Sequence, residues 1–82
     1  MEKQKDKNLV SFGIHFRKLR EELDLSQDDV VANSNKLTKA TVSDIENGKR
    51  NFAFTTFIDL AKGIGKEPNE LINLKFDLDK DA

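Results

Sequence analysis

Apolar residues recur at helical spacing between residues 10 and 23. They are separated by four, three and four positions, and charged residues fill most of the remaining positions. The apolar residues are Phe12, Phe16, Leu19 and Leu23. This spacing places them on one stripe and predicts an amphipathic helix. Asp24 follows where the chain must leave the helix, and Asp tolerates the left-handed conformation that ends many helices.

A second, shorter helix is predicted after a polar N-cap residue. Ser26 precedes Asp28 and Asp29, and acidic residues in a first turn interact favourably with the helix dipole. The helix should therefore start at Ser26 and run to about Asn33. The turn formers of residues 34–36 then break the pattern.

A third helix should follow Thr38, the next N-cap candidate, and extend over residues 39–47. Val42 and Ile45 lie three positions apart and are expected to face the core. Gly48 stands where a helix end favours a left-handed residue.

The helical period continues after residue 53 and later changes to the period of a strand. Five apolar residues predict a fourth helix ending at Gly65. They are Phe54, Phe57, Ile58, Ala61 and Ile64. A fifth helix should span about residues 68–73, with Pro in its first turn and with Leu71 and Ile72 inward. Residues 72–79 alternate apolar and polar without exception, which is typical of a strand.

Composition excludes several kinds of site. A chain of 82 residues supports one domain with a small core. It contains no Cys and one His, which excludes disulfides, zinc fingers and histidine-rich metal clusters, so no cofactor is expected. Without a secretory signal or an apolar run of about 18 residues, the protein is expected in the cytoplasm. Its net charge of −1 does not by itself suggest a nucleic-acid partner.

Two short helices around a tight turn, flanked by other helices, have the geometry of a helix-turn-helix. The runs L-D-L-S-Q-D-D-V-V, T-K-A-T-V-S-D-I-E-N-G-K-R-N and L-A-K-G-I-G-K-E-P-N-E-L resemble the DNA-binding domain of the Cro/C1-type (Xre) family over about residues 12–74. The resemblance implies an all-α fold, a compact five-helix lambda-repressor-like domain. We place this domain at residues 9–74, between a flexible N-terminal tail, residues 1–8, and a C-terminal tail, residues 75–82.

The turn between the second and third helices departs from the family pattern. The family usually has one residue fewer between its Ser-Gln pair and the recognition helix, and often a Gly in the turn. This chain has Ser34-Asn35-Lys36-Leu37 instead. Asn35 is therefore expected to be left-handed, and Leu37 should anchor the turn against the core.

The outer face of the third helix carries the candidate base readers, because a recognition helix enters the major groove by its N-terminal end. They are Lys39, Ala40, Thr41, Ser43 and Asp44. Lys39 has donors for guanine, and Asp44 can accept from cytosine. The methyl groups of Ala40 and Thr41 suit a thymine methyl. The alternative is that Lys39 contacts only phosphate and Asp44 is a solvated charge.

Residues at helix ends are candidates for contacts to the DNA backbone, which position a protein without reading sequence. They are Ser26, Gln27, Thr38, Asn47, Lys49, Arg50 and Asn51. The resemblance implies that Gln27 grips the sugar-phosphate backbone and that Thr38 caps the recognition helix. Lys49 and Arg50 also suit the negative end of the helix dipole.

The resemblance further implies a partly buried ion pair between Arg20 and Glu46, tying the first helix to the third. The alternative is a pair of independent surface charges. If the pair is buried, removing one partner strands the other charge and costs several kcal/mol.

The alternating C-terminal segment is the candidate dimer interface. Leu74, Phe76 and Leu78 share one face and are expected to pack across a homodimer two-fold as a strand or extended arm. The alternative is a frayed amphipathic terminus. Family members of this size usually bind palindromes as dimers.

The sequence therefore predicts specific binding of double-stranded DNA by a bacterial or phage transcriptional regulator acting as a homodimer. The competing function is an antitoxin or another module that binds a toxin or RNA polymerase. No nucleophile–base pair or phosphate loop is evident, and His15 is expected to be solvated, so an enzyme is not expected. Residues 36–50 hold four basic and two acidic residues, a local surplus that suits DNA despite the net charge.

Overall fold

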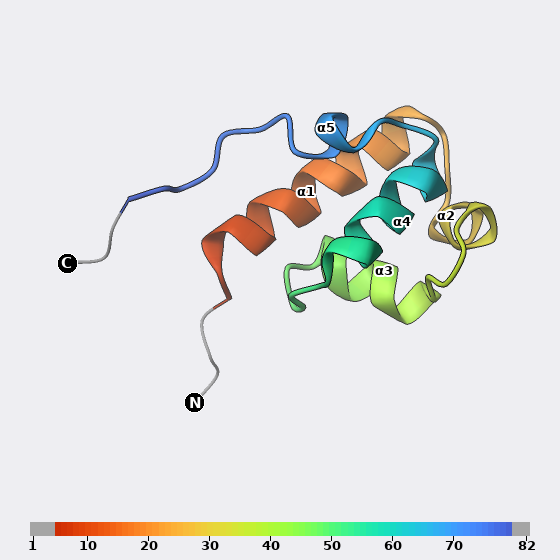
Figure 1. Cartoon of the computed structure of the whole chain (residues 1–82), viewed down its shortest axis with the longest axis horizontal. Coiled ribbons are helices and arrows are strands. Elements are labelled where there is room, and N and C mark those ends of the chain that lie inside the picture. Colours follow the sequence, from red (N-terminus) through yellow and green to blue (C-terminus); the bar gives the residue numbers. More distant parts are fainter. Residues whose placement is uncertain (1–4, 80–82) are drawn as a thin grey trace.

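Five helices form the regular structure of residues 5–79, the part of the chain that this computed structural model describes (Figure 1). They are α1 (Lys7–Glu22), α2 (Gln27–Asn33), α3 (Lys39–Glu46), α4 (Phe54–Ile64) and α5 (Pro68–Leu71). No strand occurs within the described range. The predicted all-α, five-helix fold is confirmed. None of the described helices has the length and apolar character needed to cross a membrane.

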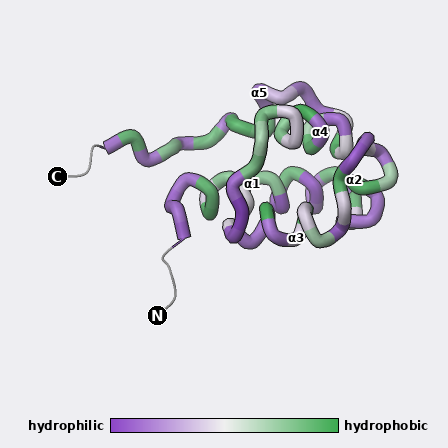
Figure 2. The backbone as a smooth tube through the Cα atoms, turned by 60° about the horizontal axis from the view of Figure 1, so that its bottom comes forward, coloured by the Kyte–Doolittle hydropathy of each residue, from purple (hydrophilic) through white to green (hydrophobic). Residues whose placement is uncertain are grey.

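The predicted apolar stripes meet in one core. α1 packs against α3 and α5, while α4 packs against α2 and α5, and α2 also contacts α3. Apolar and polar residues are interspersed along α1 and α4, as expected for helices with one buried face (Figure 2). The core residues are Phe12, Phe16, Val30, Leu37, Val42, Ile45, Leu60, Ala61, Ile64 and Leu71. Leu37 thus anchors the α2–α3 turn, as predicted.

Two glycines allow helices to approach closely. A Cβ atom at Gly63 of α4 would lie 2.6 Å from Val30 Cγ1 and 2.8 Å from the Val30 carbonyl oxygen in α2. A Cβ atom at Gly13 of α1 would meet the carbonyl oxygens of Ile45 and Glu46 in α3. α3 therefore lies close against the backbone of α1, and α2 lies close against the backbone of α4.

α1 begins at Lys7, three positions before the residue 10 that the apolar spacing indicated. Asp6 is the N-cap, and its carboxylate accepts hydrogen bonds from the amides of Asn8 at 2.8 Å and Leu9 at 3.1 Å. The first two added residues, Lys7 and Asn8, are polar, so the apolar spacing could not indicate this start. At the other end Asp24 has φ 59°, the left-handed conformation predicted for it.

Asn35 does not adopt the left-handed conformation that the sequence suggested. The positive-φ residues of the described chain are Asp24, Gly48 and Gly65. The amides of Asn35 and Lys36 donate instead to the carboxylate of Asp59. A distant side chain holds the turn, so a left-handed residue is not needed there.

Three apolar side chains from the predicted fourth and fifth helices are exposed, among them Ile72, which was expected to face inward. Phe54 is 73% exposed, Ile58 38% and Ile72 46%. Phe54 is the first residue of α4, and its ring contacts Phe57 with centroids 6.0 Å apart. Ile72 lies beyond the last residue of α5, Leu71, where the predicted helix ends early. Helical spacing identifies a face, but not how far neighbouring elements cover it.

The C-terminal segment forms an extended arm and not a strand (Figure 1). The side-chain amide of Asn8 donates to the Asp77 carbonyl at 3.0 Å and accepts from the Asp77 amide at 2.8 Å. Lys7 Nζ lies 3.8 Å from an Asp77 carboxylate oxygen. These contacts hold the arm beside the N-terminal end of α1. Of the two forms expected for this segment, the extended arm is the one seen in residues 5–79, where no neighbouring strand pairs with it. Its contact across a dimer two-fold stays a prediction.

Candidate nucleic-acid interface

The residues of α3 and its flanks determine where this helix begins and ends and which of its faces is buried. Thr38 Oγ1 accepts a hydrogen bond from the Thr41 amide at 3.1 Å, capping the helix N-terminus. Gly48, just beyond the other end, has φ 69° as predicted. Val42 and Ile45 are buried, which turns the opposite face of α3 to solvent.

All five candidate base readers lie outside the core. Those exposed are Lys39 and Ala40, and those half-buried are Thr41, Ser43 and Asp44. Lys39 Nζ lies 3.5 Å from an Asp28 carboxylate oxygen in α2, and these side chains are 64% and 71% exposed. Pairs this exposed contribute little to stability. This contact therefore leaves the Lys39 ammonium available to another acceptor.

Arg50 lies against the candidate base readers. Its guanidinium donates to Thr41 Oγ1 at 3.4 Å and approaches an Asp44 carboxylate oxygen at 3.5 Å. The sequence placed Arg50 among the phosphate-contacting residues. The structure puts its donors beside the Asp44 acceptor, and an Arg fork suits either a phosphate or a guanine edge.

The two candidates at the start of α2 already have protein partners. Ser26 and Asp29 form a capping box, with Ser26 Oγ accepting from the Asp29 amide at 3.0 Å and the Asp29 carboxylate accepting from the Ser26 amide at 2.8 Å. The hydrogen bond from the Ser26 amide, with a smaller contribution from the Ser26 side chain, holds the pKa of Asp29 below its ordinary value. Gln27 is half-buried, and its amide donates to Glu46 Oε1 at 3.0 Å. Gln27 thus links α2 to α3.

Polar residues continue the outer face beyond α3. The Asn47 side chain donates to the Ser43 carbonyl at 2.9 Å, and Asn51 Oδ1 accepts from the Phe52 amide at 2.9 Å. Lys49 is exposed and has no ion-pair partner within residues 5–79. Lys5 Nζ donates to the Asn47 carbonyl at 2.9 Å, which brings a further cation to this end of α3.

A buried ion pair supports α3 from behind. Arg20 Nε lies 2.7 Å from Glu46 Oε2, and Arg20 Nη2 donates to Glu46 Oε1 at 3.0 Å. Only 10% of the Arg20 side chain and 3% of the Glu46 side chain are exposed. Arg20 Nη1 also donates to the Leu25 carbonyl at 2.8 Å. Hydrogen bonding to Glu46 raises the pKa of Arg20 despite its burial. Every charge in this cluster is paired.

Two polar residues that join helices were not identified from the sequence. Asp59 is 9% exposed within an apolar stretch of α4 and accepts two amides of the α2–α3 turn. His15, expected to be solvated, is half-buried, with Nε2 3.0 Å from the Glu70 carbonyl oxygen in α5. An acid inside an apolar run was the available signal for Asp59. His15 offered no such signal.

Comparison with known proteins identifies the family to which this helical arrangement belongs. The chain matches the family model described as helix-turn-helix over residues 16–71. It is 35% identical to the restriction-modification controller protein C.AhdI from Aeromonas hydrophila, with a TM-score of 0.75 over 80% of this chain and 98% of that chain. No curated protein matched.

Two further solved structures share the fold. A point mutant of the controller protein C.Esp1396I is 23% identical, with a TM-score of 0.76 over 84% of this chain and 86% of that chain. The wild-type C.Esp1396I is 24% identical, with a TM-score of 0.74 over 82% and 87% of the two chains. The family match and the likeness to C.AhdI lead to one conclusion: this chain belongs to the Cro/C1-type helix-turn-helix family of DNA-binding transcription regulators.

Proposed function

We propose that this chain regulates bacterial or phage transcription by binding a palindromic DNA operator as a homodimer, with α3 in the major groove. The observation that carries the proposal is the two-sided character of α3. Its outer face carries the exposed Lys39 and the half-buried Asp44, and Arg50, just beyond the helix, lies against Asp44. Its inner face is fixed to α1 by the buried pair of Arg20 and Glu46.

A restriction-modification controller is the role that the comparisons favour. The 35% identity to C.AhdI extends over nearly all of that protein. No contact in the described chain favours an antitoxin or a polymerase-binding module over it. We therefore assign the chain a cytoplasmic, non-enzymatic role in controlling restriction-modification genes.

The exposed cations after α3 are proposed to bind phosphate. Replacing Lys49 with Ala should reduce the salt dependence of DNA binding, because one phosphate contact contributes a slope of about 0.9 in log K against log salt. Fluorescence anisotropy of a labelled duplex at several salt concentrations measures this slope. Binding should weaken for all sequences alike, since phosphate contacts read no bases.

Lys18→Ala is the matched control for Lys49→Ala. Lys18 is an exposed lysine of α1 that is not among the candidate DNA-contacting residues, so its loss removes the same charge without the proposed contact. The control should keep the parental slope. Equal slopes for Lys49→Ala and the parent would show that this end of α3 does not face the DNA backbone.

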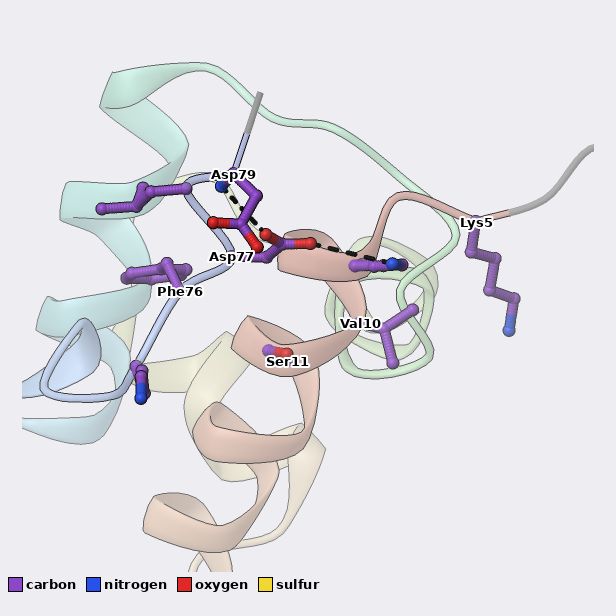
Figure 3. A pocket seen from close by; sticks show the side chains of 9 residues that line it. Lys5, Val10, Ser11, Phe76, Asp77 and Asp79 are labelled. Atoms are coloured by element: carbon purple, nitrogen blue, oxygen red, sulfur yellow. Dashed lines mark hydrogen bonds and ion pairs between the residues drawn. The ribbon is translucent and has the colours of Figure 1, made fainter. Parts of the chain in front are cut away.

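We propose that the C-terminal arm contributes to the homodimer through Leu74, Phe76 and Leu78. Leu78 is 86% exposed. A cleft of about 770 Å³ separates the arm from the start of α1, and it is lined by Val10, Phe76 and Leu78 among others (Figure 3). The apolar residues of the arm, which Asn8 ties to the start of α1, are suited to pack against the same arm of a second copy.

Leu78→Asp should shift the protein from dimer to monomer, because it places a charge in the proposed apolar interface. Deleting residues 75–82 should act in the same direction. Light scattering coupled to gel filtration measures the mass. Ile14→Asp is the control, since Ile14 is 62% exposed on α1 and does not line this cleft. An unchanged mass for both arm variants would remove the arm from the interface.

A further inference from the structure

We propose that Asp59 is a positioning residue for DNA recognition: its carboxylate fixes the α2–α3 turn and thereby the placement of α3 in the groove. This inference rests on the proposed function, and it concerns a residue of α4 outside the helix-turn-helix itself. Asp59 is not expected to touch DNA. It acts through the backbone of the turn.

Each carboxylate oxygen of Asp59 accepts a hydrogen bond from one of two consecutive backbone amides. Oδ1 accepts from the Asn35 amide and Oδ2 from the Lys36 amide, each at 2.8 Å. Asp59 is 9% exposed, so water cannot readily replace these bonds. Only a carboxylate offers a full acceptor to both amides, because an amide side chain would oppose one of them with its own N–H groups.

The turn has few other hydrogen bonds to hold it. Ser34 Oγ accepts from the Leu37 amide at 3.2 Å, and the Ser34 amide donates to the Val31 carbonyl at 3.2 Å. Without Asp59, the amides of Asn35 and Lys36 lose the partners that the structure gives them. The middle of the turn is therefore defined by a side chain more than twenty positions away.

The turn leads directly into the recognition helix. Leu37 enters the core, Thr38 caps the helix, and α3 begins at Lys39. A displacement of the turn therefore changes where Lys39 and the other base readers lie. Because good base contacts are bidentate and directional, a shift of about 1 Å is enough to weaken them.

Hydrogen bonds from the turn amides and the charge of Lys62 favour the ionised form of Asp59. Burial raises the pKa of the Asp59 carboxyl, but the amides of Asn35 and Lys36 and the charge of Lys62 outweigh this and lower it overall. Lys36, Lys62 and Arg50 line the same cavity of about 450 Å³. Since the folded-state pKa is depressed, the stabilisation is present above the unfolded pKa of about 4 and is lost as pH falls through the folded value.

The test compares Asp59→Asn and Asp59→Ala with Ile64→Val. Ile64 is a buried residue of α4 with no contact to the turn amides, so Ile64→Val controls for a loss of stability alone. Two properties are measured on each full-length variant. One is hydrogen exchange of the Asn35 and Lys36 amides by NMR. The other is the ratio of operator affinity to affinity for unrelated duplex.

In Asp59→Asn, exchange at Asn35 and Lys36 should rise by about tenfold or more, while exchange of the Val30 amide, which donates to the carbonyl of the N-cap Ser26, should change far less. The affinity ratio should fall by about 10- to 100-fold, and binding to unrelated duplex should stay within about twofold of the parent. Ile64→Val should preserve the ratio. Asp59→Asn keeps one acceptor, so it remains a usable variant if Asp59→Ala does not fold.

Unchanged exchange at the two amides, or an unchanged affinity ratio in a folded Asp59→Asn, would overturn the inference. A parent protein with no sequence preference would instead contradict the proposed function. The exchange measurement distinguishes these failures, because it reports on the turn without DNA.

Discussion

Replacing Glu46 with Ala is expected to lower the free energy of unfolding by about 3–5 kcal/mol. The substitution removes both carboxylate oxygens that neutralise Arg20, whose side chain is only 10% exposed. It also removes the acceptor of the Gln27 amide. A buried guanidinium and a half-buried amide are then left without these partners. Urea denaturation followed by circular dichroism measures the loss.

Glu21→Ala provides the matched control. Glu21 also pairs with an arginine, with Arg17 Nε 3.3 Å from its carboxylate, but these side chains are 59% and 57% exposed. Removing this exposed pair should cost less than about 0.5 kcal/mol. A Glu46→Ala protein within about 0.5 kcal/mol of the parent would show that the Arg20–Glu46 pair does not stabilise the fold.

Gly13→Ala should be the second most damaging substitution, at about 1–3 kcal/mol. Alanine is the better helix former by about 1 kcal/mol, so helix propensity alone predicts the opposite sign. The added Cβ would meet the Ile45 carbonyl oxygen and lie 2.7 Å from the Glu46 carbonyl oxygen. Because backbone atoms cannot rotate away, α1 and α3 must separate. Thermal and urea unfolding both report the change.

Gly65→Ala separates this steric effect from backbone strain. Gly65 has φ 70°, and a Cβ atom there would have no heavy atom of residues 5–79 within 4 Å, apart from atoms of Gly65 and its two neighbours in the chain. Its replacement should cost about 1–2 kcal/mol through the left-handed backbone alone, and α1 should keep its place against α3.

Gly13→Ala should also weaken specific DNA binding, since it displaces the recognition helix. A Gly13→Ala protein as stable as the parent would contradict the close approach of these helices.

Local features of the sequence were sufficient to predict most of the fold. The spacing of Phe12 and Phe16, the caps Ser26 and Thr38, and the stop at Gly48 are all properties of neighbouring residues. They define helices and faces through steric and hydrogen-bonding preferences that act within a few positions. The family resemblance then supplied the arrangement of the helices.

Long-range contacts were beyond the reach of those local patterns. Asp59 binds the turn at Asn35, and Asn8 binds Asp77, each pair far apart in the chain. The exposure of Phe54 likewise depends on which elements fail to cover it. For the candidate site, helical spacing identified the outer face of α3, whereas the position of Arg50 on that face required the fold.

The position of Arg50, which depends on the fold, affects the proposed recognition of DNA. Next to Asp44 and Thr41 it is placed to restrain one base reader and to donate to a base itself. Lys39, held only by an exposed contact to Asp28, remains adjustable. Specificity in this protein is thus proposed to combine the Asp44–Arg50 pair with the more exposed Lys39.

Selection of bound duplexes from a random DNA library tests the central claim most directly. The account predicts enrichment of a palindromic motif with half-sites about one helical turn apart. Substitution of Lys39 should change the preferred bases within each half-site at a cost of about 1–3 kcal/mol. Recovery of unenriched sequence by the folded parent protein would contradict direct readout by α3.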